Sequence, residues 1–171
     1  MFNVVFSDAS RKRNIYKIGL IKSLLDNVFN GHDKESGAYF TYEQLFSRFA
    51  ENYWNLVVKY DLRQMRKDGK SEFSKVELIF KQVFLENNTL SLLQFESIDE
   101  QKKSKIIRQV TTECKSCVVG ALYNDLDGVI YAFDLKEKGR TLNYCIYNFM
   151  LKYKSELEQL NYYSWARFLE K

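Results

Sequence analysis

The fold is decided by two stretches of the sequence, Ile15-Tyr-Lys-Ile-Gly-Leu-Ile-Lys-Ser-Leu-Leu-Asp26 and Tyr42-Glu-Gln-Leu-Phe-Ser-Arg-Phe-Ala-Glu-Asn-Tyr-Trp54. Apolar residues recur in both at steps of three and four: Ile18, Ile21, Leu25 and Val28, then Leu45, Phe49, Tyr53, Leu56 and Tyr60. This spacing places them on one side of an α-helix. We predict two helices, residues 13–29 and 42–60, whose apolar sides pack against each other.

The composition suits one folded domain. The 171 residues are 46% hydrophobic, which is ample for a core that buries roughly 70% of the unfolded surface. Proline is absent, and proline-free chains suit long helices. No run reaches the roughly 18 apolar residues of a membrane span, and the first residues lack the basic start of a signal peptide. We predict one helical domain over residues 1–171, cytoplasmic and without membrane contact.

Further helices are predicted along the rest of the chain. Thr41 with Gln44 forms a capping box before the second helix, and Ser97 with Glu100 forms another before a helix to about Cys117. Residues 73–85 have a third set of apolar residues at helical spacing and are predicted to form a helix. After Gly139 a last stripe runs to the end of the sequence, through Ile146, Met150, Tyr153, Leu157, Leu160, Trp165, Phe168 and Leu169. No stop signal follows it, so we expect a longer natural chain or a partner that covers this helix.

One β-hairpin is predicted within this helical chain. The segments 118–123 and 129–133 are rich in β-branched and aromatic residues, and they flank the turn Asn124-Asp-Leu-Asp-Gly128. Such an arrangement is typical of two strands joined by a tight turn. The predicted fold class is therefore mainly α, a helical bundle-like domain with one β-hairpin.

The hairpin carries the candidate metal ligands of the chain: Asp125, Asp127 and Asp134, with Lys136 two residues further on. Carboxylates on adjacent strands beside a lysine can hold a magnesium ion, as in nucleases of the acid-x-Lys type. Aspartate is also a common residue in turns, where it needs no metal. The structural turn is the favoured interpretation, and the metal site is the alternative.

Cysteine and histidine chemistry is sparse. Cys114 and Cys117 have the spacing of half a zinc site, but only Cys145 and His32 could complete the four ligands that a structural site needs. We expect buried, reduced thiols instead. His32 is the only histidine and stands beside Asp33 with no marked nucleophile, so the sequence indicates no catalytic residue.

Two groups of cations are candidate nucleic-acid contacts. Arg11, Lys12, Arg13 and Lys17 crowd the first helix, and Arg63, Arg66 and Lys67 follow the second helix together with Trp54. Cations bind phosphates and an aromatic ring can stack on a base. The net charge of +4 permits such contacts without demanding them. The alternative for both groups is a solvated charged surface.

Three segments carry a family resemblance: residues 13–26, Phe46-Ser-Arg-Phe-Ala-Glu-Asn-Tyr-Trp-Asn-Leu-Val-Val-Lys-Tyr60, and Leu160-Asn-Tyr-Tyr-Ser-Trp-Ala-Arg-Phe-Leu-Glu170. Together they resemble the N-terminal region of bacterial HNH endonuclease proteins. In that family the catalytic ββα-metal module lies downstream with its own histidines, and none of it is present in this sequence. The resemblance therefore implies a nuclease-associated domain, without catalytic residues or a cofactor of its own. Any divalent metal would belong to the parent's nuclease module.

We expect this chain to recognise or position nucleic acid for an HNH-type endonuclease with a restriction or anti-phage role, and DNA is the expected substrate of the parent. The expected partner at the C-terminal helix is the downstream nuclease module or another protein. Two alternatives remain. One is a structural or homo-oligomeric module that associates through Trp165, Phe168 and Leu169 without binding nucleic acid. The other is a metal-dependent nuclease centred on the hairpin.

Overall fold

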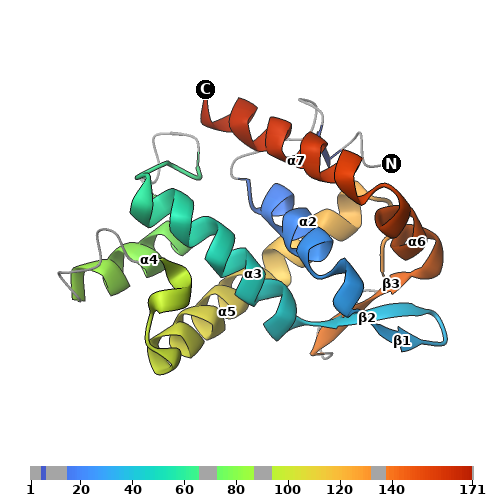
Figure 1. Ribbon diagram of the computed structural model, residues 1–171, viewed down its shortest axis with the longest axis horizontal. Coiled ribbons are helices and arrows are strands. Elements are labelled where there is room, and N and C mark those ends of the chain that lie inside the picture. The colour runs from blue at the N-terminus through green and yellow to red at the C-terminus, as the bar shows by residue number, and fades with distance from the viewer. Residues whose placement is uncertain (1–4, 7–14, 66–72, 87–93, 132–137, 171) are drawn as a thin grey trace.

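The computed structural model describes residues 5–6, 15–65, 73–86, 94–131 and 138–170. Helices dominate it, and a small antiparallel sheet lies at one end (Figure 1). The predicted fold class, mainly α with a hairpin, is confirmed. In the described part of the chain, no helix has both the length and the apolar character needed to cross a membrane.

Helix α2 (Tyr16–Asp26) lies at the centre of the packing, in contact with α3, α5 and α7 (Figure 1). It is shorter than predicted and is followed by a 3-10 turn, Val28–Asn30. The residues that it buries extend well beyond one stripe, from Ile18 to Leu25. A helix surrounded on several sides is expected to be apolar on more than one face, which explains why Leu20 and Leu24 are buried as well.

Helix α3 (Tyr42–Trp54) begins as the sequence predicts. The Thr41 hydroxyl accepts a hydrogen bond from the Gln44 amide at 3.1 Å, and the Gln44 side chain accepts one from the Thr41 amide at 2.8 Å. The helix continues as a π-helical stretch, Asn55–Lys59. The predicted pairing of the first two helices is confirmed: the ring of Tyr16 meets Phe49 and Tyr53 edge-on, with centroids 5.9 and 5.8 Å apart.

The sheet has the order β1-β2-β3, with β1 (His32–Lys34), β2 (Gly37–Thr41) and β3 (Gly139–Asn143) all antiparallel to their neighbours. Its hairpin is β1–β2, a strand pair that the sequence pattern does not predict. The β2–β3 pair joins residues about a hundred positions apart, and their backbones approach closely. A Cβ atom on Gly37 would lie 1.7 Å from the carbonyl oxygen of Leu142, and one on Gly139 would lie 2.1 Å from that of Phe40.

The hairpin predicted at residues 118–133 is wrong, because α5 (Glu100–Asp125) continues through its first strand. A stripe at steps of four extends from Ile106 through Val110, Cys114, Val118 and Leu122, and all of these side chains are buried. Packing of this stripe outweighs the β propensity of the valines. The turn itself is present: Asp127 and Gly128 have positive φ angles and end the helix. Asp99 caps α5, in place of the predicted Ser97 box.

Helix α4 (Lys75–Glu86) packs on α5 and on the π-helical stretch. The chain ends in α6 (Tyr144–Lys152) and α7 (Lys154–Leu169), which follow β3. Most of the last apolar stripe is covered by the chain itself, since α7 packs on α2 and leaves Trp165 and Phe168 only 5% and 6% exposed, whereas Tyr153 stays exposed. The interface on these two residues that the structural alternative requires is therefore not available.

Candidate nucleic-acid interface

The largest accumulation of exposed positive charge on one described helix lies on α5. From Gln101 to Thr112 this helix has no acidic residue. Lys102, Lys105 and Arg108 are exposed, and Lys115 is half-buried. Steps of three and seven residues keep these four side chains on the solvent side of the helix. We call them the α5 basic face.

Two members of this face are electrostatically uncompensated in the described part of the chain. Lys105 and Arg108 make no ion pair there, whereas Lys103 pairs with Glu100 at 2.6 Å. Exposed cations that hold no intramolecular partner remain available to an external anion such as a phosphate.

A groove of about 390 Å³ runs beside the α5 basic face, between α5 and the first turn of α3. It is lined by Glu43 of α3 and by Ser104, Ile107, Arg108, Thr111 and Thr112 of α5. Glu43 and Arg108 are both exposed and the Ile107 side chain is half-buried, so the groove combines one anion, one cation and one apolar surface.

Lys115 of the α5 basic face and one further cation, Arg140, approach the same end of α3. The Lys115 ammonium lies 5.3 Å from the centroid of the Tyr42 ring, and the Arg140 guanidinium lies 5.1 Å from it. Arg140 is only 1% exposed, and its Nη1 donates a hydrogen bond to the carbonyl oxygen of Gly139 at 2.8 Å. A buried positive charge is screened less by salt than an exposed one, so Arg140 adds positive potential where β3 meets α3.

The sequence places Trp54 among the candidate contacts, and this prediction is wrong. Trp54 is 0% exposed and packs its indole against Phe80 and Phe95, with centroids 5.5 and 6.0 Å away. It is a core residue with no face open to a base. Arg63 is half-buried, with its guanidinium 4.6 Å from the ring centroid of Phe73.

Lys17, a candidate phosphate contact, and Asp125, a candidate metal ligand, bind each other. Their Nζ and Oδ2 atoms are 2.6 Å apart, and both side chains are about one-fifth exposed. This ion pair joins α2 to the C-terminal end of α5. Asp127 is exposed at the helix end, and the first of the two strands that we predicted for these carboxylates is helical instead.

In the ranges that the structure describes, no three His, Cys, Asp or Glu side chains lie together as a metal site would require. The candidates Arg11, Lys12, Arg13, Arg66, Lys67, Asp134 and Lys136 lie outside the described residues. His32 and Asp33 are exposed on β1. Of the cysteines, Cys114 is buried as expected, but Cys117 and Cys145 are exposed, which corrects the prediction for these two.

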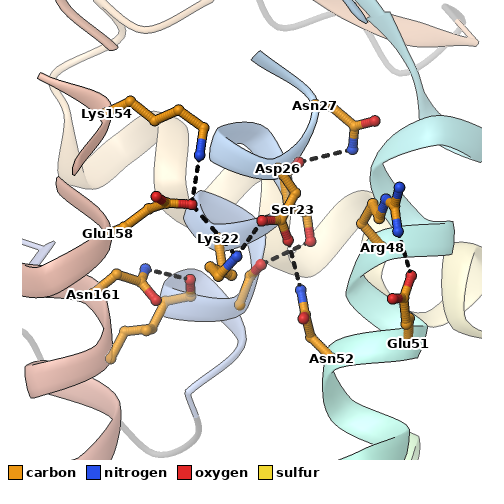
Figure 2. Close-up of polar contacts among 12 residues, drawn as sticks. Lys22, Ser23, Asp26, Asn27, Arg48, Glu51, Asn52, Lys154, Glu158 and Asn161 are labelled. Atoms are coloured by element: carbon orange, nitrogen blue, oxygen red, sulfur yellow. Dashed lines mark hydrogen bonds and ion pairs between the residues drawn. The ribbon is translucent and has the colours of Figure 1, made fainter. Parts of the chain in front are cut away.

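A second charged cluster ties α2 to its neighbours and is already satisfied internally (Figure 2). Lys22 is 6% exposed and lies between Asp26 and Glu158. Burial alone would lower the pKa of Lys22, but the hydrogen bond and the charge of Asp26 outweigh it and raise that pKa. Asn52 of α3 donates to Asp26 at 3.0 Å, and Lys154 pairs with Glu158 at 2.7 Å. This cluster holds helices together.

A second cavity, of about 400 Å³, lies between the π-helical stretch and α4. Val57, Val58, Phe84 and Leu85 give it a mainly apolar lining, with Asp61 and Lys81 as its charged residues. The Lys81 Nζ lies 3.6 Å from an Asp61 carboxylate oxygen. Its charges are thus paired across the cavity, unlike Lys105 and Arg108 of the α5 basic face in the described part of the chain.

Comparison with known proteins identifies no relative for this arrangement: no protein-family model, no curated protein and no solved structure matches the chain.

Proposed function

We propose that this domain binds DNA through the α5 basic face and positions it for an HNH-type endonuclease module. The observation that carries the proposal is the pair Lys105 and Arg108, two exposed cations without ion-pair partners in the described residues, beside a groove lined with polar side chains. Phosphate contacts of this kind fix the position of a protein on nucleic acid without reading its sequence.

The role as a positioning domain rests on the resemblance to the N-terminal region of HNH endonucleases. The three segments that carry the resemblance supply α2, α3 and α7, which pack together as the core. Under this proposal the core is a scaffold, and the exposed side of α5 is the working surface. Catalysis and any divalent metal would come from the nuclease module, and the parent would act in restriction or anti-phage defence.

Arg11, Lys12, Arg13, Arg66 and Lys67 are kept in the proposal as further phosphate contacts. Lys17 is not included among the phosphate contacts, because its ammonium group forms an ion pair with Asp125. A metal-dependent nuclease centred on residues 118–133 has less support, since the first of the two strands that would align its carboxylates is part of the continuous helix α5.

The test is the salt dependence of DNA binding by the full chain, with mixed-sequence DNA in duplex and single-stranded form. We expect log K to fall linearly with log salt, by about 0.9 per phosphate contact on a duplex. The variant Lys105→Gln/Arg108→Gln removes two contacts, so its slope should be smaller by roughly 2.

The matched control is Lys59→Gln/Lys152→Gln, which removes the same charge from exposed lysines of the π-helical stretch and α6. We expect it to leave the slope almost unchanged. A separate Arg11→Gln/Lys12→Gln/Arg13→Gln variant measures the contribution of the first basic group. Absence of binding by the parent chain at low salt would contradict the proposal, and so would equal slopes for the α5 variant and its control.

A further inference from the structure

Three side chains of the groove beside the α5 basic face, those of Glu43, Thr111 and Thr112, can accept hydrogen bonds from an occupant. Thr111 donates its hydroxyl proton to the carbonyl oxygen of Ile107 at 2.7 Å, and Thr112 donates to that of Arg108 at 2.9 Å. Both hydroxyl oxygens then present lone pairs outward as acceptors. The Glu43 carboxylate, which is acceptor-only when ionised, lines the groove with them.

We propose that this groove receives one unpaired nucleotide and selects a base with an exocyclic amino group, cytosine over thymine, through Glu43. The inference rests on the proposed function, because it requires DNA on the α5 basic face. A cytosine N4 amino group donates to a carboxylate, whereas the O4 atom of thymine is an acceptor at the corresponding position. Thymine would therefore bring two acceptors together and leave the carboxylate desolvated without a partner.

The size of the groove fits one nucleotide. Its volume of about 390 Å³ lies near the lower end of the roughly 300–1,000 Å³ found for small-molecule sites. Ile107 offers an apolar contact for the face of a base, and Arg108 offers a cation for its phosphate. The remaining strand would continue along Lys105 and Lys102, which follow Arg108 on the exposed side of α5.

Glu43 stands in the first turn of α3, where its charge favours the helix dipole, and its carboxylate oxygens remain available to a ligand. It is exposed and makes no ion pair or side-chain hydrogen bond in the described part of the chain, because Thr41 and Gln44 cap α3. An uncompensated carboxylate on a phosphate-binding surface lowers affinity for every strand. A base that donates a hydrogen bond to the carboxylate offsets this cost and a base that cannot donate does not, which is the behaviour of a selective contact.

The test compares oligo-deoxycytidine with oligo-thymidine, as short single strands at mildly alkaline pH, bound to the full chain by fluorescence anisotropy. We expect the parent chain to prefer oligo-deoxycytidine by about fivefold, the lower end of what one good base contact provides. In Glu43→Gln the amide can both donate and accept. The ratio of the affinity for oligo-deoxycytidine to the affinity for oligo-thymidine should then fall to about one, while the affinity for oligo-thymidine rises.

Two controls separate this inference from the proposed function. Glu156→Gln makes the same change in the first turn of α7, where the residue is also exposed, and should keep the preference. Arg108→Gln should lower the affinity for both strands by a similar factor. Equal binding of the two strands by the parent chain, or a preference that survives Glu43→Gln, overturns the inference and leaves DNA binding intact. Failure to bind either single strand while duplex DNA is bound at low salt also overturns the inference alone, and failure to bind single-stranded and duplex DNA alike overturns both.

Discussion

The indole Nε1 of Trp165 donates a hydrogen bond to the side-chain oxygen of Gln64, 3.3 Å away, and both residues are buried. The bond joins α7 to the segment that follows the π-helical stretch, across a hundred residues of sequence. The ring of Trp165 also packs on Tyr53 of α3, with centroids 5.2 Å apart. Helices α2, α3 and α7 are therefore one physical unit, in which α7 completes the core begun by α2 and α3.

Trp165→Phe should destabilise the protein by about 1–3 kcal/mol, the usual cost of a buried polar atom left without its partner. The substitution keeps an aromatic ring beside Tyr53 but removes the donor for Gln64. The loss is measured as the change in free energy of unfolding by urea denaturation.

The control for this change is Tyr163→Phe, which removes a polar group from a neighbouring side chain that is 60% exposed. We expect a change within about 0.5 kcal/mol, as for most surface substitutions. A Trp165→Phe variant as stable as the parent would contradict the role assigned to this hydrogen bond.

Gly19→Ala should destabilise α2 although alanine is the better helix former by about 1 kcal/mol. A Cβ atom at position 19 would lie 2.3 Å from Cε2 of Tyr53 and 3.0 Å from Cε2 of Phe49. Those rings are stacked at 4.4 Å and cannot both move away cheaply. We expect a net loss of about 1–3 kcal/mol from overpacking.

The second substitution Tyr53→Leu tests the cause of that loss. Removing the ring makes room for the methyl group, so Gly19→Ala should cost less in the Tyr53→Leu background than in the parent. A double-mutant cycle on thermal or urea unfolding measures this coupling. Strictly additive losses would show that the Tyr53 ring is not what excludes a side chain at position 19.

Glu77→Gln should weaken the start of α4. The Glu77 carboxylate, 1% exposed, accepts hydrogen bonds from the amides of Gln64 at 2.9 Å and Ser74 at 2.6 Å, one on each oxygen. Glutamine has one side-chain oxygen, so one buried amide loses its acceptor at a cost of about 1–3 kcal/mol. Urea denaturation measures the loss, and Glu100→Gln, whose carboxylate is well exposed, is the neutral control. Equal stability of the two variants would refute this role of Glu77.

Glu51 makes stability depend on pH. Burial raises the pKa of this carboxyl group, Arg48 opposes the shift, and the neighbouring Glu96 adds to it. The unfolded chain then releases this proton before the folded one, so the contribution of Glu51 to stability falls as pH rises above about 4. As pH rises above about 4, we expect the free energy of unfolding of Glu51→Gln to increase relative to that of the parent. Urea unfolding at several pH values measures this difference. Parallel pH profiles for the two proteins would contradict it.

Local sequence patterns predicted the parts of the fold that depend on local chemistry. The stripes of α2 and α3 and the capping box of Thr41 are read directly from spacing and residue type. Ser74 and Glu77 form the same type of box, Ser-x-x-Glu, at the start of α4. We did not predict this third box, although its two residues stand at the spacing that identifies the Thr41 box.

The sheet and the end of α5 could not be predicted in the same way. Gly37 and Gly139 look like loop residues, and their role becomes visible only when β2 and β3 lie close together. The valines at 118 and 119 have high β propensity, yet they continue a buried stripe whose partners are distant in sequence. Long-range packing decides both cases, and a local pattern does not contain it.

The candidate site also combines features that the local sequence predicts with features that depend on long-range packing. The sequence shows where the cations and aromatic residues stand, but not which of them already have partners within the fold. Lys17 and Trp54 are therefore candidate nucleic-acid contacts in the sequence, whereas in the structure Lys17 pairs with Asp125 and Trp54 packs on Phe80 in the core. The signal for the α5 basic face was present as twelve residues without an acid. Glu43 could not be connected with it, because the groove joins the beginning of α3 to the middle of α5.

The most direct test of the central claim is an NMR titration of the isotope-labelled full chain with a short DNA strand at low salt. Binding through the α5 basic face predicts saturable amide shifts centred on residues 101–115 and the first turn of α3, with further shifts at residues 11–13 and 66–67 if these are the additional phosphate contacts. The amides of α7 and of the apolar cavity at Val57 and Leu85 should stay unchanged. Saturable shifts centred on those other regions, or no shifts at all, would contradict the account.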